Sequence, residues 1–173
     1  VLRSANTVGG DTHYSTGGNF KIENLNGSLG GLFSPYYPVI RASGDVYFDF
    51  YQGASLHILA GGSVKIPGSV WIQGSEISNN SLAETITTSD GSTVSIDGSA
   101  EPTLDIRAGT TAFGAPFFNT GNPSSADIKL GTIIFADPTS NFITGRVSSS
   151  QICKRGQVHV QTSPHSLKFI CGW

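Results

Sequence analysis

Charged side chains are scarce in this sequence. They make up 13% of the 173 residues, whereas roughly 25% is usual in soluble domains. Ser, Thr, Asn and 22 glycines take their place, so the chain lacks the Glu-, Lys- and Ala-rich surfaces that are typical of helices. It also lacks the combination of low hydrophobicity and high net charge that marks a disordered tail. These shortages favour an all-β protein.

Several classes of function find no support in the composition. The net charge is −2, which provides no electrostatic surface for nucleic acid. No run of about 18 apolar residues predicts a membrane span, and no signal-peptide pattern opens the chain. The chain begins at Val1 and contains no methionine, from which we expect a processed product or a piece of a longer protein. Phosphate-binding, dinucleotide-binding and nucleophile-elbow motifs are missing in the contexts that they need, so no cofactor is predicted.

Cysteine is also rare, with Cys153 and Cys171 as the only two. In an oxidising compartment they would close a loop worth about 3 kcal/mol in the chain-entropy model. We predict this disulfide, and the alternative is a pair of reduced, buried thiols. His159 and His165 lie nearby but lack the paired spacing of a zinc site, so no metal site is predicted.

Internal similarity is the main positive signal. Four stretches combine alternating apolar residues with a bend of small residues, and they begin at Ile40, Ile58, Ile106 and, more weakly, Ile128. Their first residues are 18, 48 and 22 positions apart. If the middle interval holds two units, one of them with an insertion, the period is about 20 residues, which is typical of stacked repeats.

Stacking explains why such a unit would repeat. Alternation places one set of side chains on one face of a strand, and glycines at the bend let the chain turn a corner. One unit cannot bury its own apolar face, but successive coils with parallel pairing can. The pattern therefore predicts a parallel β-helix, with a β-sandwich as the alternative.

The coils are expected over residues 1–144, with one projecting insertion. Residues 84–96 hold two Thr/Ile/Val-rich segments around Asp90-Gly91, which is the pattern of a β-hairpin with a type I′ turn. Residues 145–173 contain further strand patterns and both cysteines. We expect this tail to form C-terminal strands or a cap over the end of the stack, where free strand edges would otherwise promote aggregation.

Several sequence blocks resemble the filamentous haemagglutinin family of large cyanobacterial proteins. The resemblance covers residues 8–135 and rests on the blocks Gly18–Glu23, Gly27–Gly30, Leu32–Pro35, Ile40–Val46, Gly53–Val64 and Pro102–Thr111, which occur in the same order. It implies a right-handed parallel β-helix and two-partner secretion through an outer-membrane pore. It also implies a secreted or surface-exposed exoprotein, of which this chain would be a segment beyond the N-terminal secretion domain. The tail after Ser140 has no counterpart in the resemblance.

Aromatic residues are the candidate ligand-binding groups. Tyr36, Tyr51 and Trp71 belong to an aromatic cluster, and aromatic rings are enriched at binding surfaces. The alternative is that the cluster fills the interior or plugs an end. Phe48 and Phe50 are two positions apart and are expected on the same face, so part of the cluster should be core.

No catalytic residue is predicted. Asp45 and Asp49 should lie roughly 13 Å apart along a strand, which is too far for the paired carboxylates of a glycosidase. The group Asp97, Glu101 and Asp105 has a similar spacing, and Asp105 and His57 are expected to face solvent between apolar neighbours. We therefore expect a non-catalytic structural or adhesive segment.

The alternative function is a carbohydrate-binding or polysaccharide-cleaving module on the same scaffold. Possible partners are surface glycans or proteins of other cells, the outer-membrane secretion pore during export, and a second copy of the chain that associates through the ends of the stack. Two close carboxylates in a groove, or several exposed aromatic residues, would favour the alternative over a plain structural role.

Overall fold

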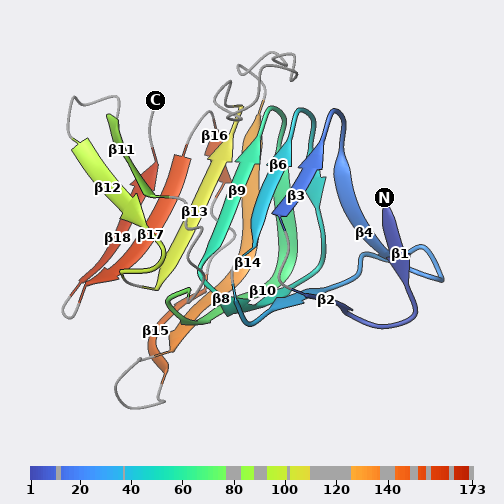
Figure 1. Cartoon of the computed structure of the whole chain (residues 1–173), viewed down its shortest axis with the longest axis horizontal. Coiled ribbons are helices and arrows are strands. Elements are labelled where there is room, and N and C mark those ends of the chain that lie inside the picture. Colours follow the sequence, from blue (N-terminus) through green and yellow to red (C-terminus); the bar gives the residue numbers. More distant parts are fainter. Residues whose placement is uncertain are drawn as a thin grey trace.

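In the computed structural model of this chain, the described residues form β-strands and the turns between them (Figure 1). The structure describes residues 1–10, 13–36, 38–76, 83–87, 93–100, 102–109, 126–136, 143–148, 152–154, 157–163 and 166–171. For residues 84, 86, 87, 93, 94, 136 and all those after 142, it describes the backbone alone. None of the described residues is helical, and ten of their fifteen strand pairs are parallel. The prediction of an all-β protein is confirmed.

The parallel strands form three stacks. The first contains β1 (Leu2–Ser4), β4 (Phe20–Asn24), β7 (Val46–Tyr47) and the first halves of β10 (Val64–Gly74) and β14 (Asp127–Ala136). The second contains β2 (Val8–Gly9), β5 (Leu32–Ser34), β8 (Tyr51–Ala54) and the second halves of β10 and β14. The third contains β3 (His13–Thr16), β6 (Val39–Ala42), β9 (Leu56–Ala60) and β13 (Thr103–Ala108). Because β10 and β14 each bend from the first stack into the second, these two stacks belong to one ten-stranded sheet.

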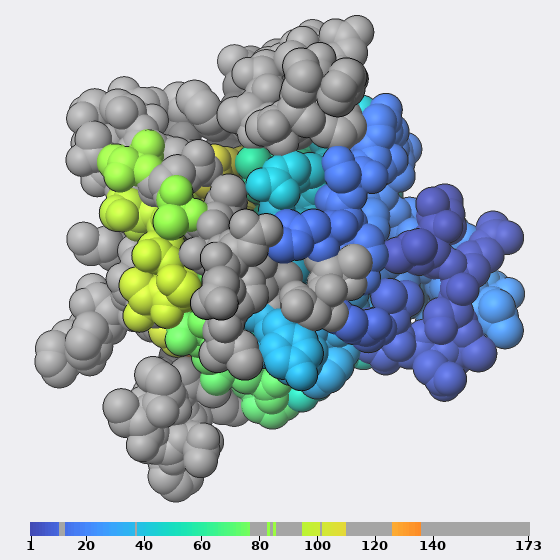
Figure 2. Space-filling model, viewed as in Figure 1, coloured from blue at the N-terminus to red at the C-terminus, as the bar shows by residue number. Residues whose placement is uncertain are grey.

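The chain visits the three stacks in the same order in each round. A residue in one round pairs with its counterpart in the next, so that Phe20 pairs with Val46 after 26 residues and Ile40 pairs with Ile58 after 18. Successive rounds are laid side by side along the long axis, which the blue-to-yellow progression in Figure 2 shows. The period of about 20 residues that the sequence indicates therefore corresponds to the number of residues between one strand and its partner in the next round.

The predicted alignment of the repeats is correct for three of the four stretches. Ile40, Ile58 and Ile106 occupy one continuous row of the third stack. The interval of 48 residues between Ile58 and Ile106 holds a single round with a long insertion rather than two units, because β9 pairs directly with β13. Ile128 was aligned wrongly, since it pairs with Val64 in the first stack. Strands of every stack share the same alternation, so alternation alone does not assign a strand to its stack.

One hydrophobic core lies between the three stacks. Inward-pointing side chains from all three stacks form it, and they alternate along the strands as the sequence pattern predicts. The first stack contributes Val46 and Ile128, the second Leu32 and Tyr51, and the third the row of isoleucines described above, and all of them are almost fully buried. Since each stack supplies only one apolar face, none of the three could bury its side chains without the other two.

Glycines allow a tight polar corner between the third stack and the first. Asp45, the residue before β7, accepts a hydrogen bond through Oδ1 from the backbone N–H of Ser63 at 2.7 Å, and Asn19 Oδ1 accepts one from the N–H of Asp45 at 2.9 Å. A Cβ atom on Gly62 would lie 2.1 Å from Asp45 Oδ1, and one on Gly44 would lie 2.1 Å from Asn19 Oδ1. The small residues at the bend therefore leave room for a ladder of side-chain hydrogen bonds that joins successive rounds.

The antiparallel strands belong to the insertion and to the tail. The predicted hairpin is present as β11 (Ala83–Thr87) paired with β12 (Thr93–Asp97) and lies at the left end of the view in Figure 1, whereas its Asp90-Gly91 turn lies outside the described residues. The tail strands are β15 (Ile143–Ser148), β16 (Ile152–Lys154), β17 (Gln157–Ser163) and β18 (Ser166–Cys171). β15 and β16 pair with β14, and β17 pairs with β13, so these three tail strands lie against the last parallel strand of each stack, and β18 pairs with β17.

Candidate functional site

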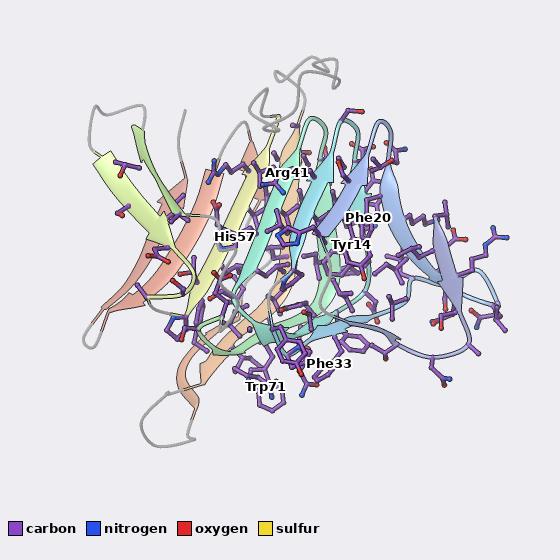
Figure 3. The ribbon with its side chains drawn as sticks, viewed as in Figure 1. Tyr14, Phe20, Phe33, Arg41, His57 and Trp71 are labelled. Carbon is purple, nitrogen blue, oxygen red and sulfur yellow. The ribbon has the colours of Figure 1, made fainter. Side chains whose placement is uncertain are left out.

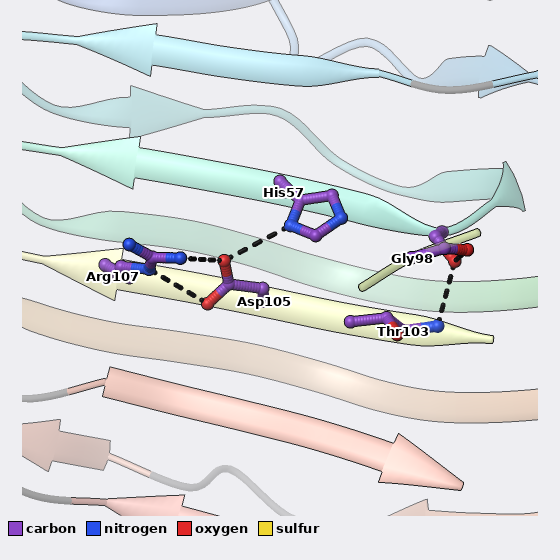
Figure 4. Close-up of polar contacts among 6 residues, drawn as sticks. His57, Gly98, Thr103, Asp105 and Arg107 are labelled. Atoms are coloured by element: carbon purple, nitrogen blue, oxygen red, sulfur yellow. Dashed lines mark hydrogen bonds and ion pairs between the residues drawn. The ribbon is translucent and has the colours of Figure 1, made fainter. Parts of the chain in front are cut away.

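A group of ionisable side chains lies on the outer face of the third stack. His57 in β9 and Asp105 in β13 are paired positions, and His57 points away from the core because Leu56 and Ile58 on either side of it point inward (Figure 3). His57 Nδ1 lies 3.2 Å from Asp105 Oδ2 (Figure 4). Arg107 donates from Nε to Asp105 Oδ1 at 3.1 Å and from Nη2 to Oδ2 at 2.8 Å. One aspartate, one histidine and one arginine are thus linked into one cluster.

The Asp105 carboxylate is charged in this cluster in spite of its burial. Burial alone would raise its pKa, but the hydrogen bond from His57 and the charge of Arg107 outweigh that effect and lower the pKa to about 2. A carboxylate only accepts hydrogen bonds, so His57 donates to Asp105 through Nδ1. Neither His57 nor Asp105 has any exposed surface.

The prediction that His57 and Asp105 face solvent is wrong. Both point outward from the core, as the alternation indicates, but the chain that leaves the hairpin crosses over that face. A Cβ atom on Gly98 would lie 2.7 Å from His57 Nε2, and the carbonyl of Gly98 accepts a hydrogen bond from the N–H of Glu76 at 2.8 Å. Alternation identifies the face on which a side chain lies, but it carries no information about a distant segment that covers that face.

Together with His57 and Asp105, Ser55 provides the three residue types of a Ser-His-Asp hydrolytic triad. Its hydroxyl, however, is hydrogen-bonded to the backbone. Ser55 Oγ donates to the carbonyl of Gly98 at 2.8 Å and accepts from the N–H of Thr103 at 2.9 Å. In a hydrolytic triad the hydroxyl proton is directed at the histidine. Here it is directed at a backbone carbonyl in a fully buried site, so the arrangement attaches the insertion to the sheet and presents no nucleophile.

Two of the other carboxylates named in the sequence analysis, those of Asp45 and Asp97, hold local structure together. Asp45 accepts from Tyr47 Oη at 2.8 Å in addition to its corner hydrogen bond, and burial together with that carboxylate raises the pKa of Tyr47 to about 12. Asp97 accepts from the Ser99 hydroxyl at 2.6 Å, and hydrogen bonds from Ser99 hold the pKa of Asp97 below its usual value. Asp49 is half-buried between β7 and β8, and Glu101 lies outside the described residues.

The chain matches no known family model, no curated protein and no solved structure. Within the part that the structure describes, no group of three or more His, Cys, Asp or Glu side chains is placed to hold a metal ion. The same part holds no helix of the length and hydrophobicity that crossing a membrane requires.

A second candidate site is an exposed aromatic surface on the second stack. Register places Gly9, Phe33, Gln52, Trp71 and Ile134 in one row, and they point outward because the preceding row, which includes Leu32 and Tyr51, points into the core. Figure 3 shows Phe33 and Trp71 on the same side of the molecule.

Phe50 extends this surface into the next outward row. It precedes Tyr51, it is half-buried, and its ring would lie 2.2 Å from a Cβ atom on Gly31, so it covers the backbone of the round before. Phe33, Phe50, Gln52 and Trp71 are called the aromatic face below. Phe33 is 38% exposed and the other three are half-buried.

Only one of the three predicted ligand-binding residues, Trp71, belongs to the aromatic face. Tyr36 is 46% exposed and lies two residues after β5. Tyr51 is fully buried, and its hydroxyl donates to the carbonyls of Ala54 at 2.7 Å and Ser34 at 3.2 Å, so it belongs to the core and has no surface for a ligand.

The sequence analysis missed Phe33 and Phe50. The sequence signal that could have identified Phe33 is its position between Leu32 and Ser34, because the side chains on either side of an inward-pointing residue in a strand point outward. Phe48 and Phe50 were expected on one face, yet Phe48 is fully buried in the core and Phe50 is not. The reason is a corner, since β7 ends at Tyr47 and the next strand starts at Tyr51, so the alternation is interrupted between the two phenylalanines.

The two cysteines lie in different tail strands. Cys153 in β16 pairs with Ile128, and Cys171 in β18 pairs with Val158. Their side chains lie outside the described part of the chain, so the disulfide remains a prediction.

Proposed function

We propose that the chain is a right-handed parallel β-helix that acts as a non-catalytic structural or adhesive segment of a secreted bacterial surface exoprotein of the filamentous haemagglutinin type. The observation that carries the proposal is the in-register pairing of successive rounds in three stacks around one core. Such an arrangement builds long, regular outer faces from short repeats, and proteins of this kind use those faces for binding.

The chemistry of the described side chains supports a non-catalytic role. The cluster of His57, Asp105 and Arg107 is buried and is occupied with its own hydrogen bonds. Asp45 and Asp97 bind neighbouring backbone or hydroxyl groups. In this proposal the chain reaches the cell surface through an outer-membrane secretion pore, and its partners are glycans or proteins of other cells.

A binding assay with whole cells tests this proposal. Purified chain is mixed with washed bacterial cells and sedimented with them, and the bound fraction is measured over a range of protein concentrations. The same preparation is incubated with neutral and acidic polysaccharides, and reducing ends are counted. Saturable binding to cells without new reducing ends supports the proposal. Release of reducing ends would overturn the non-catalytic role, and the absence of cell binding by folded protein would overturn the adhesive one.

A further inference from the structure

We propose that the aromatic face is a binding site for a neutral, β-1,4-linked glycan chain that lies across the strands, parallel to the long axis of the molecule. This inference goes beyond the presenting role proposed above because it names a site and a ligand class. It rests on the described residues of the second stack alone and does not depend on an exoprotein origin.

The first argument is the chemistry of the side chains on this face. Phe33, Phe50 and Trp71 present aromatic rings on one outer face, and Gln52 lies between Phe33 and Trp71 in the outward row. Aromatic rings bind the C–H faces of pyranose sugars by stacking, and a side-chain amide both donates and accepts hydrogen bonds from hydroxyl groups. A flat sheet that bears rings around an amide therefore matches a ligand whose surface alternates between C–H faces and hydroxyl edges.

The second argument is spacing. Phe33 and Trp71 are separated by one intervening strand, and neighbouring strands lie about 4.8 Å apart, so their backbone positions are about 9.6 Å apart along the stack. In an extended β-1,4-linked chain each sugar is turned over relative to its neighbour, so every second sugar presents the same face. A spacing of two strands corresponds to two sugar units, which places the sugar between the two stacked ones opposite Gln52. A coiled α-1,4-linked chain does not repeat its faces in this way.

The third argument is charge. In the parallel strands of the second stack this outward row consists of uncharged residues, namely Gly9, Phe33, Gln52, Trp71 and Ile134. The first charged position in the row is Arg146 of β15, which pairs with Ile134, two strands beyond Trp71. A glycan that carries carboxylates or sulfates would lose hydration against Phe33, Gln52 and Trp71 without gaining a cationic partner from these three residues, and this loss is costly. The face therefore fits a neutral glycan better than an acidic one.

Trp71 provides a further, independent indication. Its Nε1–H is shielded from solvent and has no hydrogen-bond partner among the described residues. Leaving a buried donor unsatisfied is costly. A small rotation of the half-buried indole would bring this donor to a sugar hydroxyl at the ring edge, so a bound glycan would satisfy it.

Calorimetric titration with defined oligosaccharides tests the proposal. The probes are cellohexaose as the neutral β-1,4-linked chain, maltohexaose as the α-1,4-linked control, and hexagalacturonate as the acidic control. We expect saturable binding of cellohexaose and little or none of the other two. Phe33→Ala and Trp71→Ala should each weaken cellohexaose binding about tenfold, since each removes one stacking contact. Trp71→Phe retains the ring but not the donor and should lose less.

Leu25→Ala is the matched control, because Leu25 is 71% exposed and lies in a turn after β4, outside the aromatic face. Circular dichroism of every variant establishes that the fold is retained. Equal affinity of the Phe33→Ala and wild-type chains would overturn the site, and equal binding of hexagalacturonate would overturn the neutral ligand class. Loss of a concentration-dependent dimer in Phe33→Ala would assign the face to a second copy instead. Because soluble oligosaccharides replace cells here, failure of this proposal is distinct from failure of the cell-binding assay.

Discussion

At the scale of single residues, the buried cluster of His57, Asp105 and Arg107 shows how the insertion is attached to the sheet. Its members come from neighbouring strands and face the chain that leaves the hairpin. Buried ion pairs gain little net stability over apolar packing, but removal of one partner is costly because a buried charge loses its compensation. The largest effect on stability is therefore expected when one of the three side chains is removed and the other two stay buried.

The substitution Asp105→Asn tests this dependence. It removes the carboxylate that accepts two hydrogen bonds from Arg107, and we expect the free energy of unfolding to fall by about 3 kcal/mol. Urea denaturation monitored by circular dichroism measures the change. Asp127→Asn is the control, because the side chain of Asp127 is 32% exposed and its ion pair with Lys129 is 4.0 Å long. A loss at Asp105 no larger than the loss at Asp127 would contradict the role of the cluster.

Acid should weaken the protein through the same carboxylate. The pKa of Asp105 is about 2 in the folded chain, below its usual value of 3.8, so the folded state binds its proton less readily than the unfolded state. The stability that Asp105 contributes is therefore complete above pH 4 and is lost as the pH falls toward 2. Urea denaturation at several pH values should show this decline, with a shallower slope in Asp105→Asn. An identical slope in both proteins would refute the assignment.

At the scale of elements, the corner ladder explains why Gly62 and Gly44 occupy equivalent positions in successive rounds. Their backbones pass close to Asp45 and Asn19, whose side chains bind the backbone of the next round. Any larger residue at these glycines must displace a hydrogen-bonded side chain.

Gly62→Ala should therefore destabilise the protein. Its Cβ atom would lie 2.1 Å from Asp45 Oδ1 and 3.0 Å from the Asp45 backbone nitrogen, and overpacking of this kind costs about 1–3 kcal/mol. Thermal unfolding measures the effect as a lower Tm. Gly17→Ala is the matched control, since nothing lies within 4 Å of its Cβ position. Equal shifts in the two variants would show that the corner has more room than the structure indicates.

Strands and bends were predictable from the sequence because their signal is local. Ile40 and Ile58 share a pattern of alternation followed by small residues, and they are in fact paired. Ile128 has the same pattern but lies in another stack, since the order of the stacks depends on the whole path of the chain. Burial of His57 depends on contact with Gly98, 41 positions later, so no local window contained it. Of the aromatic face only Trp71 was predicted, for a similar reason, because the face combines residues from three rounds.

At the scale of the whole molecule, the two ends of the stacks differ. Among the described strands, β1, β2 and β3 each pair on one side only, whereas the last parallel strands, β13 and β14, are covered by antiparallel tail strands. Exposed strand edges are templates for pairing with another chain. Any self-association through an end of the stacks is therefore expected at β1–β3.

Removal of the tail should create a second associating end. A chain that stops at residue 142 exposes the edges of β13 and β14, and we expect it to form concentration-dependent oligomers or aggregates. Light scattering coupled to size-exclusion chromatography measures the mass of both chains at equal concentrations. A truncated chain that stays folded and has the same association state as the full chain would contradict a covering role for the tail.

The same difference between the ends means that the molecule should resist pulling less at its N-terminal end than at its C-terminal end. Under tension applied at the N-terminus, the outermost round is held by strands of only two to four residues and is the first to detach. The next two rounds add 26 and 18 residues of free chain, which corresponds to roughly 60–90 Å each at about 3.4 Å per residue, and the round with the insertion adds 64 residues. The structure should therefore lengthen in small, successive steps from one end, and a segment with this property absorbs work under load instead of breaking in a single event.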